Sequence, residues 1–173
     1  LITPPPEEHT LLTARVAKTL LDHGFTSAYG ASEAKLRLGV AVRNEVDAGR
    51  LPGPRIRAGS LEITVTGGLG DESRLHNRRN APSMVIDGPE EMRKAVRLSC
   101  REGCDNIKLD VSGDPFYPAT PADCTTMSLE EIQMAVRTAH GFGKMVNAHA
   151  RSIQSVQYSV IAGVDMIYHA EYS

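Results

Sequence analysis

The chain has 173 residues, of which 41% are hydrophobic and 23% charged, and its formal net charge is −2. This length is enough for one domain with a hydrophobic core. The balance of charge argues against a nucleic-acid or membrane-surface partner. No apolar run reaches the roughly 18 residues of a membrane-spanning helix. The three cysteines lack the spacing of a disulfide framework, which argues against a secreted disulfide scaffold.

Helical and strand-like periodicity alternate along the chain. We expect helices over residues 7–22, 34–48, 89–102, 128–140 and 153–162. We expect strands over residues 25–29, 55–59, 106–111, 144–149 and 164–169. This alternation is typical of a parallel sheet, so we predict an α/β fold. A complete (β/α)8 barrel takes about 250 residues, so residues 1–173 are expected to be part of a single barrel domain.

The stretch from residue 60 to residue 89 shows little periodicity. It contains a glycine-rich segment, residues 66–71, followed by a polar and basic one. Long loops inside compact domains are mostly functional or disordered. We therefore predict a substrate-facing loop here, and His76 within it is a candidate substrate contact.

Three polar residues lie near the ends of short apolar runs. They are Lys108, His149 and His169. Residues at the carboxyl ends of barrel strands converge on one cavity, and a neutral imidazole is a common ligand of transition metals. Each histidine alone is equally well explained by a structural hydrogen bond, but two on consecutive strands beside a lysine favour a metal site.

Lys108 has several possible roles. Strand alternation places it on the inward face with Asp110. Burial lowers the pKa of a lysine, and the neutral amine can add carbon dioxide to form a carbamate that bridges two cations. The alternatives are a lysine that extends into solvent, one that pairs with Asp110, or the nucleophile of a Schiff-base aldolase.

Short motifs follow one another through nearly the whole chain. They are Gly24-Phe25-Thr26, Gly53-Pro54-Arg55-Ile56, Thr66-Gly67-Gly68, Ile107-Lys108 with Ser112-Gly113, Ala139-His140 before Ala148-His149-Ala150, and Ala162-Gly163-Val164-Asp165 before His169. In this ordered set the chain resembles the amidohydrolase superfamily, in the branch of imidazolonepropionase-like enzymes and Xaa-Pro dipeptidases.

The resemblance implies a distorted (β/α)8 barrel with one or two divalent metals, most often zinc. Carboxylated Lys108 would bridge the two metals of a binuclear centre, and His149 and His169 would bind the second one. The family also needs a His-x-His pair on strand one and a catalytic aspartate on strand eight. The chain has no His-x-His, so we expect it to cover roughly strands two to six and to lack the catalytic base.

Two positions depart from the pattern of the dipeptidase-like members. Leu69 stands where they have histidine in Thr-Gly-Gly-His-Gly, and Arg151 stands where they often have tyrosine. Both positions face substrate in the family, so the resemblance no longer implies a simple dipeptide. The arginine fork would suit a substrate carboxylate.

The resulting prediction is a hydrolase that cleaves an amide, dipeptide, carbamate or urea C–N bond with a metal-activated water. Its substrate would be a small molecule, its location cytoplasmic, and homo-oligomerisation is left open. The alternative is a metal-free, non-catalytic binding scaffold or pseudoenzyme of the same fold.

Overall fold

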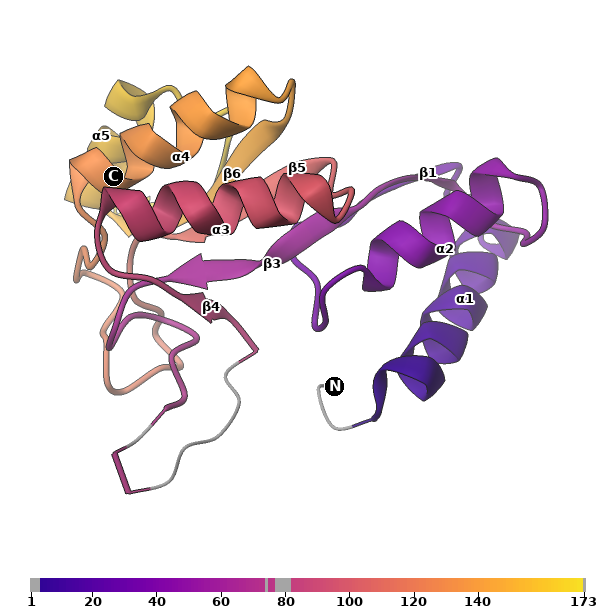
Figure 1. Cartoon of the computed structure of the whole chain (residues 1–173). Helices are drawn as coiled ribbons and strands as arrows, with labels where there is room; N and C mark the ends of the chain where they lie inside the picture. The colour runs from indigo at the N-terminus through magenta and orange to yellow at the C-terminus, as the bar shows by residue number, and fades with distance from the viewer. Residues whose placement is uncertain (1–3, 74, 77–81, 173) are drawn as a thin grey trace.

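The computed structural model describes residues 4–73, 75–76 and 82–172. Helices and strands alternate along the described chain, except that three strands follow one another between Arg55 and Val85 (Figure 1). The helices are α1 (Pro6–Asp22), α2 (Leu38–Asp47), α3 (Pro89–Arg101), α4 (Leu129–Gly141) and α5 (Ile153–Ala162). The strands are β1 (Ser27–Tyr29), β2 (Arg55–Arg57), β3 (Gly59–Thr64), β4 (Met84–Val85), β5 (Asn106–Asp110), β6 (Met145–Ser152) and β7 (Met166–Tyr172).

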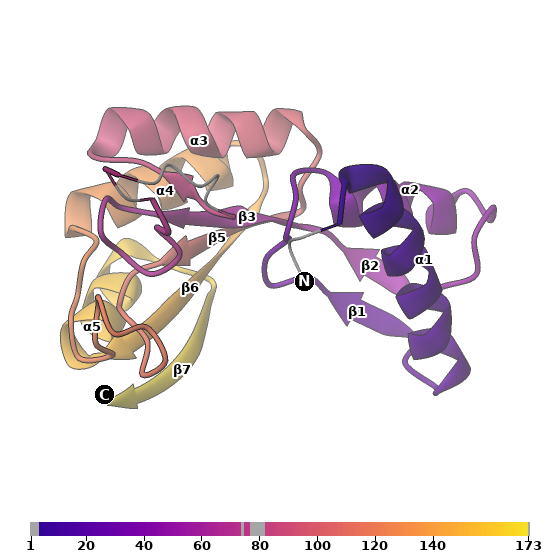
Figure 2. The same cartoon turned by 90° about the horizontal axis from the view of Figure 1, so that it is seen from below.

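All strand pairs are parallel. Strands β4, β3, β5, β6 and β7 form one sheet in that order, and β1 pairs with β2 in a second, smaller sheet. Only Ala58 separates β2 from β3, so one extended segment links the two sheets (Figure 2). The predicted α/β class with parallel strands is confirmed.

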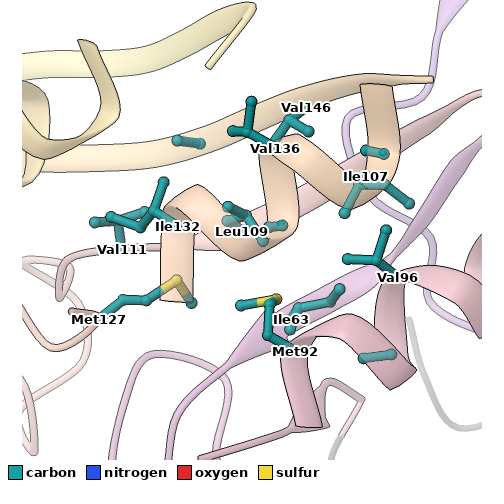
Figure 3. Packing of buried hydrophobic residues seen from close by; sticks show 14 of the residues in the cluster. Ile63, Met92, Val96, Ile107, Leu109, Val111, Met127, Ile132, Val136 and Val146 are labelled. Carbon is teal, nitrogen blue, oxygen red and sulfur yellow. The ribbon is translucent and has the colours of Figure 1, made fainter. Parts of the chain in front are cut away.

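Helices α3, α4 and α5 cover one face of the larger sheet (Figures 1 and 2). Alternate residues of a strand point to opposite faces, so the apolar residues of the strands pack under these helices. This core includes Ile63, Met92, Val96, Ile107, Leu109, Ile132, Val136 and Val146 (Figure 3). Burying one such aliphatic side chain contributes about 1.5–3 kcal/mol. The intervening residues of β5 and β6 form a polar row on the opposite face.

Residues 60–89 do not form one irregular loop, and that prediction was wrong. The segment begins inside β3 and includes β4, which pairs with β3 at Ile63 and Thr64. The sequence does contain a strand-like alternation here, because Ile63 and Val65 alternate with polar residues, and both belong to the core. The strand was overlooked because it opens with Gly59 and Ser60 and because the glycine-rich segment, residues 66–71, follows it closely.

Several boundaries also differ from expectation. Strand β6 continues to Ser152 and β7 to Tyr172, so His149 and His169 lie within their strands rather than at the ends. Helix α2 begins at Leu38 rather than at residue 34, because Arg37 before it has a left-handed φ of 69°. These differences move side chains along the sheet edge but leave the order of elements unchanged.

A capping box is present at the start of α4. The hydroxyl of Ser128 accepts from the backbone N–H of Glu131, and the Glu131 carboxylate accepts from the backbone N–H of Ser128. The same carboxylate accepts from the backbone N–H of Gly88, just before α3. One glutamate thus stabilises the starts of two helices. Across the described residues, no helix is long and apolar enough to cross a membrane.

Candidate metal and substrate site

The three predicted metal-site residues lie on neighbouring strands of the larger sheet. Lys108 is on β5, His149 on β6 and His169 on β7. Asp110 is the register partner of His149, and Ala150 is the register partner of His169. Because the strands are parallel, their carboxyl ends share one edge, where the loops after β3 and β5 also gather (Figure 1).

Lys108 forms a buried ion pair. Its side chain is 7% exposed and that of Asp110 is 0% exposed, and Nζ of Lys108 donates to Oδ1 of Asp110 at 2.8 Å. Burial raises the pKa of Asp110 to about 7, although the charge of Lys108 opposes the shift. Of the arrangements that the sequence left open for Lys108, the structure has the pair with Asp110.

The second oxygen of Asp110 is an unusual feature of this pair. Oδ2 is buried and has no hydrogen-bond partner in the part of the chain that the structure describes. An unsatisfied buried polar atom costs about 1–3 kcal/mol. Such an atom beside a predicted metal site is consistent with a polar or cationic group that completes the site.

His149 is buried and has a defined hydrogen-bonding state. Its Nε2 lies 2.8 Å from the carbonyl oxygen of Gly113, so Nε2 carries the hydrogen and donates. Burial, followed by the charge of Lys108, lowers the pKa of His149 to about 4 despite that hydrogen bond. The imidazole is therefore neutral at pH 7, and Nδ1 retains the lone pair that a metal would use.

His169 contacts His149 directly. The two ring centroids are 4.5 Å apart with an interplanar angle of 64°, which is an edge-to-face contact. His169 and Ala170 have left-handed φ angles of 77° and 52°, and the register between β6 and β7 shifts at this point. Such a bulge redirects side chains and is frequent near functional sites. His169 is largely exposed. The part of its ring that is buried lowers its pKa most, and the positive charges of Arg151 and Lys108 lower it further.

Arg151 lies beside these residues, between two carboxylates. Its Nε donates to Oδ2 of Asp114 at 3.1 Å, and its Nη1 donates to Glu171. Burial alone would raise the pKa of Asp114, but the backbone N–H of Phe116 and the charge of Arg151 outweigh it, so the pKa is lowered. A substrate carboxylate would have to share the guanidinium with these groups.

The sequence did not single out Asp114 or Glu171 as parts of the site. Asp114 follows β5 in a Gly-Asp-Pro turn, and a polar residue just beyond a strand end was the signal that could have identified it. Glu171 offered no comparable signal, because its position depends on the bulge in β7.

The glycine-rich segment packs against the loop that follows β5. The hydroxyl of Thr120 donates to the carbonyl oxygen of Gly67 at 2.6 Å, and that of Tyr117 donates to the carbonyl oxygen of Asp71 at 2.6 Å. Leu69, in this segment, is half-buried.

His76 is exposed in a turn. Among the described residues, no hydrogen bond or ion pair joins it to Lys108, His149, His169 or Arg151. The structure thus brings four of the six predicted site residues together, places Leu69 in a neighbouring loop, and leaves His76 apart.

These residues fit one part of a metal site. Two neighbouring imidazoles and an amine are present, and a carboxylated Lys108 would add two oxygen ligands. Over residues 4–73, 75–76 and 82–172, no three His, Cys, Asp or Glu side chains are close enough together to hold a metal ion. The donor set is therefore two histidines plus a lysine that must first leave its ion pair.

Comparison with known proteins decides the family. The model of the amidohydrolase family matches residues 4–173. The chain belongs to the amidohydrolase family. Ochratoxinase from Aspergillus niger is 26% identical over 181 residues, which cover 92% of this chain and 36% of that protein. The amidohydrolase resemblance carried by the motifs is confirmed.

Solved amidohydrolase-like structures share the fold. A prolidase complexed with N-methylphosphonate-L-proline is 28% identical with a TM-score of 0.87, and covers 99% of this chain and 43% of that one. A Xaa-Pro dipeptidase with bound methionine is 28% identical with a TM-score of 0.83, and the match covers 91% of this chain and 40% of that one. This chain therefore spans well under half the length of these relatives, and its fold is that of a partial (β/α)8 barrel.

Proposed function

We propose that the protein carrying this chain is a metal-dependent hydrolase of amide-type C–N bonds. The observation that carries the proposal is the contact between the rings of His149 and His169 beside the buried Lys108. Membership of the amidohydrolase family supports hydrolysis of amide-type bonds in general. Metal dependence, zinc as the metal and a carboxylated lysine are the finer parts of the proposal.

His149 through Nδ1, His169, and Lys108 after carboxylation would hold one or two divalent cations. A bound cation would polarise the scissile carbonyl and lower the pKa of a water. The chain's own residues prepare this site. The carbonyl oxygen of Gly113 orients the ring of His149, and Asp110 keeps Nζ of Lys108 at the sheet edge. No catalytic base is assigned among the residues of this chain.

The substrate would be a small molecule that carries an amide, carbamate or urea bond. Relatives named ochratoxinase, prolidase and Xaa-Pro dipeptidase support a C–N bond as the target. Arg151 would orient a substrate carboxylate from between Asp114 and Glu171, and Leu69 would contact substrate from the glycine-rich segment. His76 would join them only if its turn approaches the sheet edge.

The metal is tested with zinc alone. We expect zinc to raise the melting temperature of the protein, and at 100 times the Kd the added stability would be about 2.7 kcal/mol. His149→Ala should abolish the shift. His140→Ala is the matched control, because His140 pairs with Asp165 at the other end of the sheet. A protein that binds no zinc, cobalt or manganese by equilibrium dialysis would contradict the proposal.

One observation favours a second candidate, a metal-free binding scaffold. In the closed pair with Asp110, Lys108 is already neutralised without any metal. A scaffold would contain no metal by elemental analysis after purification without chelators, and its melting temperature would not change with EDTA. A Schiff-base enzyme would instead be trapped at Lys108 by borohydride in the presence of a carbonyl substrate.

A further inference from the structure

A cavity of about 420 Å³ lies in the loop that follows β5. Three prolines, a tyrosine and an alanine form most of its wall, and two aspartates complete it. The lining residues are Asp114, Pro115, Tyr117, Pro118, Pro121, Ala122 and Asp123. Apart from Asp114, which pairs with Arg151, these residues have no role in the site proposed above, so the cavity requires its own explanation.

The cavity adjoins the metal-site residues through Asp114. Oδ2 of Asp114 lies 3.9 Å from Nε2 of His149 and accepts from Nε of Arg151 at 3.1 Å. The preceding residue, Gly113, accepts the hydrogen bond from His149. A group bound in the cavity would therefore be attached to a substrate whose reacting bond lies beside His149.

The loop that forms the cavity holds its shape by hydrogen bonds. The backbone N–H of Asp114 donates to the carbonyl of Thr120 at 3.1 Å, and that of Thr120 donates to the carbonyl of Tyr117 at 3.0 Å. A Cβ added to Gly113 would overlap the carbonyl oxygens of Thr120 and Pro121. The hydroxyls of Tyr117 and Thr120 tie the loop to the glycine-rich segment. The cavity is therefore largely pre-formed, as ligand sites usually are.

We propose that this cavity is a substrate-specificity pocket that takes an uncharged ring carried by the amide substrate. The inference rests on the proposed function for the identity of the substrate, but ring binding is measurable without hydrolysis. Proline rings and the tyrosine ring offer rigid apolar surfaces that lose little conformational entropy on binding. The charge of Asp114 is paired with Arg151, but Asp123 is exposed at the wall and repels an anionic group, so a ring that bears a carboxylate is disfavoured in the cavity.

The test measures binding of four small amides to the protein by ligand-observed NMR. Acetanilide and N-acetylpyrrolidine carry an uncharged ring, N-methylacetamide carries none, and 4-acetamidobenzoate carries an anionic ring. We expect the two uncharged rings to bind and N-methylacetamide not to bind. Ala122→Leu fills the pocket and should raise the Kd of acetanilide by about tenfold or more.

Phe116→Ala is the matched control, because Phe116 is 90% exposed in the same loop and does not line the cavity. It should leave the Kd of acetanilide unchanged. Asp123→Asn alters an exposed residue that tolerates change, and it should strengthen binding of 4-acetamidobenzoate several-fold. This second variant keeps the test decisive if Ala122→Leu does not fold.

Equal binding of acetanilide by the native protein and a folded Ala122→Leu variant would overturn the pocket. So would a Kd of 4-acetamidobenzoate that Asp123→Asn does not change. His149→Ala should retain ring binding, because His149 does not line the cavity. Ring binding by a protein that holds no metal would leave the pocket standing and refute the proposed function. Metal binding without ring binding would refute the pocket and leave the proposed function standing.

Discussion

Lys108 and Asp110 form a buried ion pair at the carboxyl edge of the sheet, with Nζ of Lys108 2.8 Å from Oδ1 of Asp110. The two residues lie two apart on one strand and point to the same face, so no other element is needed to bring them together. The pair neutralises a charge that burial alone would make costly. Burial first, and the charge of Lys108 as a smaller cause, lower the pKa of both His149 and His169.

Lys108→Met should destabilise the protein by about 3–5 kcal/mol, because it leaves the carboxylate of Asp110 buried without a charge partner. Urea denaturation measures the loss. Adding Asp110→Leu to this variant should recover most of the stability, since both charges are then absent. Lys144→Met is the control, because Lys144 lies 3.9 Å from Asp105 near the surface and should cost less than about 1 kcal/mol. Equal losses for the two single variants would contradict the buried-pair account.

His149 should remain neutral until the pH falls near 4. Its folded-state pKa lies below the unfolded value of 6.5, so the unfolded state binds more protons between these values. This contribution to stability is present above pH 6.5 and is lost as the pH falls from 6.5 towards 4. NMR titration of the imidazole resonances in metal-free protein measures the pKa. A midpoint near 6.5 would show that the ring is not buried as described.

Asp110 should have the opposite effect on stability. Its folded-state pKa of about 7 lies above the unfolded value of 3.8, so the folded state binds more protons between these values. Its contribution is present below pH 3.8 and is lost as the pH rises through 7. Asp110→Asn should remove this loss, so that the variant gains stability relative to the native protein between pH 5 and pH 7. A stability difference that does not change with pH would contradict the raised pKa.

Gly113→Ala should disrupt the loop that follows β5. A Cβ at Gly113 would overlap two backbone carbonyl oxygens, so the loop must move away from His149. We expect a loss of about 1–3 kcal/mol and weaker zinc binding, because His149 loses the acceptor that orients it. Gly141→Ala is the matched control, since nothing lies within 4 Å of a Cβ placed there. Equal zinc affinity in both variants would show that Gly113 does not position His149.

Ser128→Ala should cost about 1 kcal/mol of stability, because it removes the side-chain acceptor at the start of α4. Glu131→Ala should cost more, since its carboxylate also accepts from the backbone N–H of Gly88. Thermal or urea unfolding measures both losses. Glu130→Ala is the control, because Glu130 is exposed in the same helical turn. A loss from Glu130→Ala as large as that from Glu131→Ala would contradict the shared role of Glu131.

The sequence allowed good prediction where structure is local. The helices over residues 128–140 and 153–162 and the strand over residues 106–111 each depend on residues a few positions apart. Strand β3 was missed because it opens with Gly59 and Ser60 and the glycine-rich segment follows it closely, although Ile63 keeps the alternation. The start of α2 was misplaced because the left-handed Arg37 depends on packing of the preceding loop.

The sequence by itself determined most of the alternation of strands and helices. It also identified Lys108, His149 and His169 as one group, because period and order along the chain specify which polar residues lie on neighbouring parallel strands. The tertiary structure decided which side chains pair. The contacts of His149 with Gly113 and of Arg151 with Asp114 and Glu171 depend on strand register, a bulge and a folded loop. These contacts join residues that are 20 to 37 positions apart. Local periodicity carries no information on which partner each side chain takes.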